Sequence, residues 1–252
     1  MTTTTMNLRS AAARLLAGLA VALLAGCATT VAHPDPRDPL EPYNRSMTRF
    51  NEHVDTMVLK PMATAYRNAV PSPVRTGVGN FFANIGDVWS FVNNALQLQG
   101  EAAASSFMRV NVNTFFGLGG VLDVASEMGI ERYKQDFGLT LGHWGVGTGP
   151  YVVLPVLGPS TVRDALALPV DWKGDLVGRV TPVSDRNALH VLRAVDVRAN
   201  LLRASSVLDS AALDKYSFTR DVYLQVRNNQ VNGRADDGEE GNSNDGVLPK
   251  EP

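Results

Sequence analysis

A segment crowded with glycine and proline, residues 136–164, constrains the fold of this chain more than any other feature. It reads DFGLTLGHWGVGTGPYVVLPVLGPSTVRD and contains six glycines and three prolines. Inside a helix, each glycine costs about 1 kcal/mol and each proline about 3 kcal/mol, so no long helix runs through it. The stretch 151–157 is nevertheless strongly apolar, so it must pack against protein or lipid and find partners for its backbone groups. We therefore expect a rigid, non-helical element with helices wrapped around it.

Helical patterns precede this segment. Asp38-Pro39-Leu40-Glu41 has the spacing of a capping box, with Pro39 at the first helical position. Apolar residues then recur at the three- and four-residue spacing of an amphipathic helix, at Tyr43, Met47, Phe50, Val54 and Met57. Pro61 is expected to break this helix, because proline lacks the backbone N–H and clashes with the preceding turn. A short helix is then predicted to about Val70.

Further helices are expected on both sides of the segment. Before it, Ser72 is predicted to cap a helix containing Phe81, Phe82 and Ile85, with a second beginning after Gly86-Asp87 and a third after Gly100. After it, three helices are predicted. Ser160 is expected to cap the first, Ser184 or Asp185 to start the second, which is the longest, and Asp214 to cap the last. No long alternating strand pattern occurs, so the predicted class is mainly α.

The stretch 115–122, FFGLGGVL, contains no charged residue. Two interpretations remain open for it. It is either a turn buried between helices or a hairpin that enters lipid.

The amino terminus has the features of an export signal. Arg9 and Arg14 precede the apolar run 15–25, whose 11 residues are too few to cross a bilayer of about 30 Å. The run ends in Leu24-Ala25-Gly26-Cys27, the lipobox of bacterial lipoproteins, so the only cysteine of the chain is predicted to carry the lipid, palmitate included. Residues 1–26 are then a signal peptide and 27–37 a lipidated tether. An incidental thiol in a cleaved peptide is the alternative, and either Met1 or Met6 is the start.

Charge is distributed unevenly along the chain. The net charge is −2, but the tail after residue 230 holds six acidic and two basic residues, and residues 1–27 hold two arginines and no acid. The stretch 28–230 is therefore neutral, which argues against nucleic acid as a partner, because binding a duplex needs a basic face. We predict one helical domain, 38–229, followed by an acidic disordered tail, 230–252.

Familiar catalytic motifs are missing or incomplete. The stretch 145–149, GVGTG, is followed by Pro150 where a nucleotide-binding helix would open, and no Gly-Lys-Ser/Thr follows. No Gly-x-Ser-x-Gly elbow occurs, and the four histidines, His143 among them, lack metal-binding spacing. We predict no catalytic residue, no metal and no cofactor.

Polar residues inside the apolar helical runs are the remaining candidates for function. They are Asn93, Asn94, Asn111, Asn113 and Thr114, with Asp136, Arg163 and Asp164 bracketing the glycine-rich segment. They either form ordinary helix surfaces, caps and an ion pair, or they line a polar path for a lipid headgroup. Such a path needs polar partners, because a charge in hydrocarbon costs several kcal/mol.

Several runs resemble the MlaA (VacJ) lipoproteins over residues 38–229. The matching runs are 38–45 (DPLEPYNR), 80–84 (NFFAN), 109–114 (RVNVNT), 136–142 (DFGLTLG), 149–155 (GPYVVLP), 157–164 (LGPSTVRD) and 220–227 (RDVYLQVR). The chain departs from the pattern at Lys215 and at Asp87-Val88, where the family usually has proline at or near those positions.

The resemblance implies a ring of amphipathic helices around a central channel, anchored by Cys27 on the periplasmic side of the outer membrane of a Gram-negative bacterium. It implies removal of mislocalised phospholipids from the outer leaflet, beside a trimeric porin, with transfer to the periplasmic carrier MlaC. A membrane-anchored phospholipase and a structural, porin-associated lipoprotein are the alternatives. The residues we expect to line the channel or contact headgroups are Asn44, Arg45, Asn111, Asn113, Asp136, Gly145, Gly147, Gly149, Arg163 and Asp164.

Overall fold

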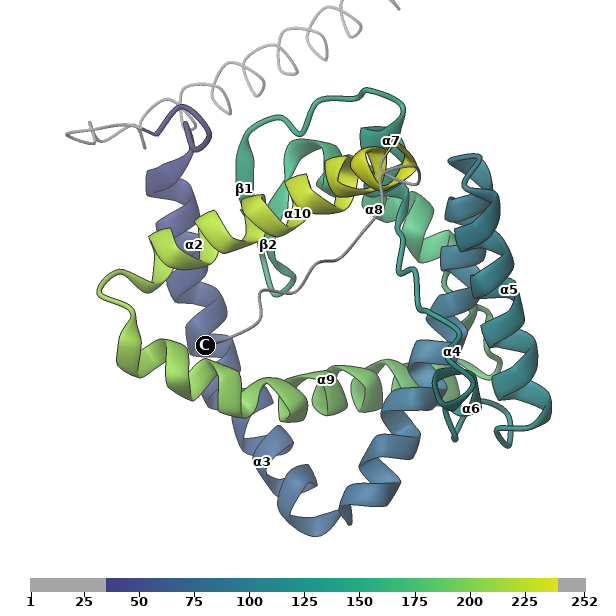
Figure 1. The fold of residues 1–252 in the computed structure, drawn as a ribbon. Coiled ribbons are helices and arrows are strands. Elements are labelled where there is room, and N and C mark those ends of the chain that lie inside the picture. The colour runs from purple at the N-terminus through teal and green to yellow at the C-terminus, as the bar shows by residue number, and fades with distance from the viewer. Residues whose placement is uncertain (1–34, 240–252) are drawn as a thin grey trace, which may run out of the picture.

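A computed structural model describes residues 35–239 of this protein. The predicted signal peptide, the lipid attachment at Cys27 and the last part of the acidic tail lie outside these residues. Within them, the helices follow one another around a ring, with a short β-hairpin on one side (Figure 1). The prediction of a mainly α class is confirmed.

The first arc of the ring is one nearly continuous helical run. Helix α2, Glu41–Val54, passes through a π-helical turn, Asp55–Leu59, into α3, Lys60–Ala69. The prediction that Pro61 breaks the helix is therefore wrong. Pro61 has no N–H and its ring needs room beside the preceding turn. The wider π turn, in which the Lys60 N–H bonds to the carbonyl of Asp55, lies immediately before it.

Helices α4, Ser72–Leu96, and α5, Gly100–Phe115, pack side by side on the opposite arc (Figure 1). The predicted break at Gly86-Asp87 is wrong, because α4 runs through it without interruption. Asp87 does not cap a new helix. Its carboxylate is buried and forms ion pairs with Arg109 and Arg132.

The uncharged turn 116–122 that follows α5 is not buried. Phe116 and Leu118 are each 74% exposed, so the interpretation of a turn buried between helices is wrong. Two of its glycines nevertheless pack tightly. At Gly120, where φ is +94°, an added Cβ would lie 2.6 Å from Asn84 of α4. The turn is therefore held to α4 by its backbone, with its apolar side chains outside. The short helix α6, Val124–Glu127, comes next.

The glycine- and proline-rich segment contains no long helix, as predicted. It forms the short helix α7, Phe137–His143, a loop, and the antiparallel strands β1, Tyr151–Leu154, and β2, Gly158–Thr161. The register pairs Tyr151 with Thr161 and Leu154 with Gly158. Tyr151 and Val153 face inward, and each is 1% exposed. The apolar segment is therefore packed against protein on one face of a hairpin.

Three further helices complete the ring. Helix α8, Val162–Gly174, is capped by Thr161, one residue later than predicted, because the Thr161 hydroxyl accepts from the Asp164 N–H. A 3-10 turn, Leu176–Arg179, leads to α9, Val183–Ala211, the longest helix as predicted. The last helix, α10, Lys215–Glu239, has the predicted Asp214 cap. It continues past residue 230, so the start of the predicted disordered tail is helical.

The apolar core of this ring is small. One cluster joins Ala63 of α3 to Ala199 and Leu202 of α9, and another joins the β-hairpin to Tyr216 of α10. Many buried side chains are polar instead, including several asparagines, aspartates and arginines. Between residues 35 and 239, no helix combines the length and apolarity needed to cross a bilayer.

Candidate functional site

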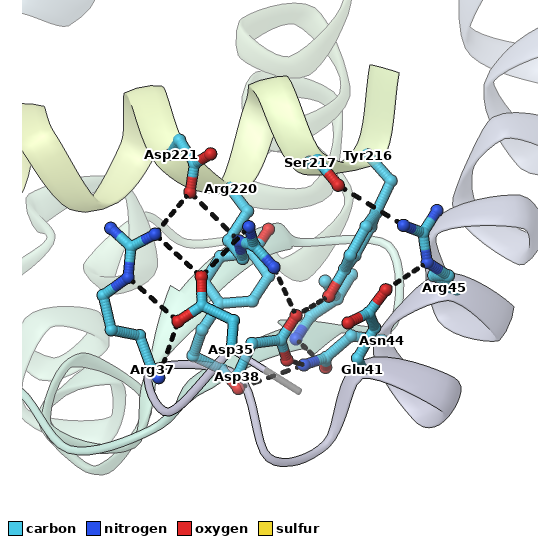
Figure 2. A network of polar contacts seen from close by, with 12 residues as sticks. Asp35, Arg37, Asp38, Glu41, Asn44, Arg45, Tyr216, Ser217, Arg220 and Asp221 are labelled. Carbon is cyan, nitrogen blue, oxygen red and sulfur yellow. Dashed lines mark hydrogen bonds and ion pairs between the residues drawn. The ribbon is translucent and has the colours of Figure 1, made fainter. Parts of the chain in front are cut away.

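A polar network joins the segment before α2 to α10 and so closes the ring (Figure 2). The buried Asp38 carboxylate accepts hydrogen bonds from the Tyr216 hydroxyl and, at 3.3 Å, from Arg220. Burial and the neighbouring Asp38 carboxylate raise the pKa of Tyr216, so its hydroxyl stays protonated and donates. Asp35 forms a second ion pair with Arg220 at 3.1 Å.

This network explains why the predicted capping box does not form. Leu40 is the N-cap residue of α2 and makes no side-chain cap bond. The Asp38 side chain is instead committed to residues far away in sequence, Tyr216 and Arg220. A tertiary contact therefore replaces the local cap.

Asn44 joins α2 to the β-hairpin. Its side-chain N–H donates to the Tyr151 carbonyl at 3.1 Å, and its oxygen accepts from the Val153 N–H at 2.8 Å. Asn51, two helical turns later, repeats the arrangement with the Leu154 carbonyl at 2.9 Å and the Val156 N–H at 2.7 Å. Asn44 occupies the edge of β1 that faces away from β2, and Asn51 contacts the turn that follows β1. The role of Asn44 in this structure is to dock the hairpin.

Arg227 of α10 ties two predicted site residues together. It donates to both Asp136 oxygens at 2.7 and 3.0 Å and to Asp164 at 2.9 Å. Burial alone would raise the pKa of Asp164. The hydrogen bonds and charge of Arg227, helped by Arg163, outweigh burial and hold this pKa below its ordinary value. The arginine therefore keeps Asp164 ionised at one wall of the ring.

A second buried cluster centres on Arg109, whose exposed fraction is 1%. Its guanidinium forms ion pairs with Asp123 at 2.6 Å and Asp87 at 3.4 Å, and donates to the Ile130 carbonyl. Asn113 donates to Asp123 at 3.0 Å and accepts from the backbone at residue 125. This cluster holds α4, α5 and the following loop together.

A cavity of about 840 Å³ lies inside the ring, bounded by α4, the segment around residue 134, the β-hairpin, α8, α9 and α10. Its walls are amphipathic. The apolar part includes Ile85, Leu154, Leu157, Leu168 and Val197. The charged part includes Arg132, Lys134, Asp171, Arg193, Asp196 and Arg227. Because both kinds of wall face one space, the cavity suits a molecule with a polar and an apolar part.

The cationic side chains in this cavity differ in how they are paired. Arg132 forms an ion pair with Asp87 at 3.1 Å, Arg193 with Asp175, and Arg227 with two carboxylates. Lys134 is exposed and makes no ion pair with any side chain that the structure describes, which in α10 are those up to residue 232. Its ammonium group is therefore available to an anionic ligand.

Two acidic side chains in the cavity are held by neutral donors. Asp171 accepts from the Trp89 indole at 2.7 Å and from the Phe137 N–H at 2.8 Å. Asp196 accepts from the Tyr66 hydroxyl at 3.0 Å. Burial raises the pKa of both carboxyls above the ordinary value.

The predicted site residues fall into two groups. Asp136 and Asp164 line the cavity. The other eight do not. Asn44 and Asn113 are buried in the contacts described above, and Arg45 forms ion pairs with Glu41 and Asp214. Asn111 donates to the Phe107 carbonyl of its own helix, and Arg163 is buried beside Asp164. Gly145 and Gly147 have open space around them, and Gly149 adopts φ of +68° next to Val162.

Sequence reasoning missed most of the lining residues. Lys134, Trp89, Asp171 and Arg193 show no distinctive local spacing, and only the fold brings them together. Among the side chains that the structure describes, no group of three or more histidine, cysteine or acidic residues is placed to hold a metal ion.

Comparison with known proteins gives one consistent result. Residues 36–230 match the MlaA lipoprotein family. The intermembrane phospholipid transport system lipoprotein MlaA of Escherichia coli K12 is 36% identical over 221 residues, which cover 85% of this chain and 87% of that protein. The protein of the same name from Haemophilus influenzae is 34% identical over 86% of this chain and 90% of its own length.

A solved structure also matches the fold. It comes from work on the structural basis for maintenance of bacterial outer membrane lipid asymmetry, and its TM-score is 0.68 at 36% sequence identity. The match covers 77% of this chain and 99% of that chain. Sequence and fold agree, and this chain belongs to the MlaA lipoprotein family.

Proposed function

We propose that this protein carries phospholipids through the cavity inside its ring, removing mislocalised phospholipids from the outer leaflet of the outer membrane. The observation that carries this proposal is the amphipathic cavity, whose lining combines apolar side chains with a lysine that has no ion-pair partner among the described side chains. A phospholipid has a charged phosphate and apolar chains, and each part would meet a matching wall. The phosphate would be contacted by Lys134.

The surface of the ring supports a position in a membrane. Many large apolar side chains are exposed, among them Phe115, Phe116 and Leu118, each more than 70% exposed. With a lipid anchor at Cys27, the ring would lie in the inner leaflet of the outer membrane, on its periplasmic side. The proposed partners are a trimeric porin within the membrane and the periplasmic carrier MlaC, which would receive the lipid.

The proposed role is transport without catalysis. The described ring offers no nucleotide-binding loop to drive lipid movement. Movement would therefore be passive or driven by the carrier that accepts the lipid.

The test compares outer-leaflet phospholipid in cells that carry the wild-type protein, no protein, Cys27→Ala or Lys134→Glu. We expect phospholipid to accumulate in the outer leaflet in all three altered strains, because each lacks the protein, its anchor or its phosphate contact. Lys173→Glu is the matched control, since this lysine is also exposed but does not line the cavity.

An unchanged outer leaflet in cells without the protein would refute the transport proposal and favour a structural role beside the porin. Release of lysolipid that depends on the protein would instead indicate a phospholipase. If only Lys134→Glu behaves like wild type, the transport proposal stands and the phosphate contact is elsewhere.

A further inference from the structure

A second, smaller space lies beside the main cavity. This groove of about 480 Å³ is formed by the first half of α4, the turn at Val121 and the first half of α9. Its lining contains no polar side chain: Pro73, Val74, Gly77, Val78, Phe81 and Phe82 come from α4, and Leu189 and Leu192 from α9. It differs in this from the main cavity, whose wall carries several charges.

Phe82 separates the two spaces and lines both. Its ring is 8% exposed and packs edge-on against Phe81 at 5.4 Å between centroids. On the other side, the Arg193 guanidinium lies 5.7 Å from the ring centroid, and Arg193 belongs to the charged wall of the cavity. One aromatic ring therefore forms the boundary between a polar and an apolar compartment.

The groove is also continuous with the exposed apolar turn 116–122, because Val121 belongs to both. Gly77 makes this approach possible, since an added Cβ there would lie 2.8 Å from the Val121 side chain. Within the groove itself, an apolar chain could thus lie between Val121 and Phe82 against a lining that is entirely apolar.

We propose that this groove binds an acyl chain of the phospholipid whose headgroup occupies the main cavity. The inference rests on the transport role proposed above and assigns a place to the apolar part of the substrate. The lipid would lie across Phe82, with its phosphate towards Lys134 and one chain between α4 and α9. Phe82 would then be a positioning residue that keeps the two parts of the lipid apart.

The test uses the full-length lipidated protein in nanodiscs and two photoreactive phosphatidylglycerol analogues. One analogue carries a diazirine in an acyl chain, and the other carries it on the headgroup. Crosslinked peptides are then identified by mass spectrometry. We expect the acyl probe to label residues 73–82 and 189–192, and the headgroup probe to label residues 132–136.

Three tryptophan variants show whether the groove and cavity hold the same lipid. Leu192→Trp fills the groove and should reduce its labelling by about tenfold or more, since one methylene in an apolar pocket changes discrimination about 10- to 200-fold. Ala83→Trp places a bulky ring in the cavity, which Ala83 lines beside Phe82, and should reduce groove labelling too. Val191→Trp adds the same bulk beside Leu192, outside both spaces, and should leave labelling unchanged.

Two outcomes would overturn the inference while the transport proposal stands. The acyl probe could label the turn 116–122 without labelling the groove. Alternatively, groove labelling could stay unchanged in Ala83→Trp, which would mean that surrounding bilayer lipid fills the groove. If neither probe labels the groove or the cavity, the transport proposal fails as well.

Discussion

Single buried arginines join separate segments of this ring, and Arg109 is the clearest case. Its side chain is 1% exposed, and its positive charge balances the negative charges of Asp87 and Asp123. Arg132 contacts the same two carboxylates, but its side chain is 31% exposed. The two arginines therefore share partners and differ in burial, which makes them a natural pair for comparison.

We predict that Arg109→Ala lowers the free energy of unfolding by about 3–5 kcal/mol, because the buried Asp87 loses its buried counter-charge and keeps only the partly exposed Arg132. Arg132→Ala should cost about 1 kcal/mol or less, because water screens an exposed pair. Urea unfolding in detergent, followed by circular dichroism, measures both. Equal losses for the two variants would contradict this assignment.

Asp164 should make stability depend on pH in the acid range. Its pKa in the folded protein lies below the ordinary value of 3.8 because Arg227 and Arg163 outweigh the effect of burial. A lowered folded-state pKa contributes stability above the unfolded-state pKa, and this contribution is lost as the pH falls through the folded value. We predict that the unfolding free energy of the wild type falls more steeply below about pH 4 than that of Asp164→Asn.

Unfolding curves measured from pH 6 downward give the unfolding free energy at each pH. The predicted difference is a steeper decrease with falling pH for the wild type. The amide variant cannot titrate, so its own dependence should be flatter even though its stability at pH 6 is lower. Parallel curves for the two proteins would show that Asp164 does not titrate within the network.

For single residues, the sequence indicated which polar residues matter better than it indicated what each of them contacts. Asp136 and Asp164 were expected near the site because they bracket the glycine-rich segment, and both line the cavity. Asn44 was expected there as well, but its polar atoms are used by the β1 backbone. Lys134 has no local signal, since its availability depends on which carboxylates the fold places near the other cations.

Between helices and strands, the contact of the β-hairpin with α2 is defined by side-chain hydrogen bonds to the hairpin backbone. Asn44 is 0% exposed and bonds to two backbone groups of β1, whereas Asn51 makes the same kind of contact at the partly exposed end of the hairpin. The helix thus provides side-chain partners where a third strand would provide backbone ones.

We predict that Asn44→Ala destabilises the protein by at least about 1–3 kcal/mol, because buried backbone groups of β1 lose their partners. Hydrogen exchange in residues 151–154 should become faster. In Asn51→Ala, water can replace the lost amide, so the loss should be below about 1 kcal/mol. Hydrogen exchange measured by mass spectrometry separates the two, and unchanged protection in Asn44→Ala would refute the docking role.

The ends of helices and strands show where tertiary contacts override the structure that the local sequence favours. The apolar spacing predicted α2, α5 and α9 well, because each helix turns one face inward. Gly86 has open space around it and Asp87 has distant arginine partners, so α4 continues where local rules place a break. The strands of the hairpin have four residues each, too few for a two-residue alternation to stand out.

The molecule as a whole is a ring that is closed by the polar network around Asp38 and Arg220. It has an amphipathic cavity inside and the exposed apolar turn 116–122 outside. The ring itself was implied by the family resemblance and was not visible in any local pattern. Closure depends on contacts such as Asp38 with Arg220, which are 182 residues apart in the chain. No rule based on neighbouring residues could have paired them.

The exposed turn should contribute to membrane binding independently of the proposed lipid anchor. In a Cys27→Ala background, we predict that Phe116→Asp with Leu118→Asp lowers binding to liposomes by about tenfold or more, since burying one large apolar side chain contributes about 1.5–3 kcal/mol. The fold should be retained, because both side chains are 74% exposed. Liposome flotation and circular dichroism measure the two effects.

The matched control for this test is Leu213→Asp in the same background. Leu213 is also fully exposed, but it lies in the connection between α9 and α10, across the ring from α5 (Figure 1). Flotation of this variant should match that of the Cys27→Ala parent. If both variants lose binding equally, the turn has no special role in membrane contact.

Asn44 of α2 has a consequence for how copies of this protein coexist. An unpaired strand edge is a template on which another chain can add a strand and begin to aggregate. A protein anchored as proposed would be confined to a surface, where copies meet often. In this ring, Asn44 already occupies the outer edge of β1 at Tyr151 and Val153, and the Arg37 carbonyl accepts from the Tyr151 N–H. The contact that docks the hairpin therefore also prevents β1 from recruiting a strand from a neighbouring copy.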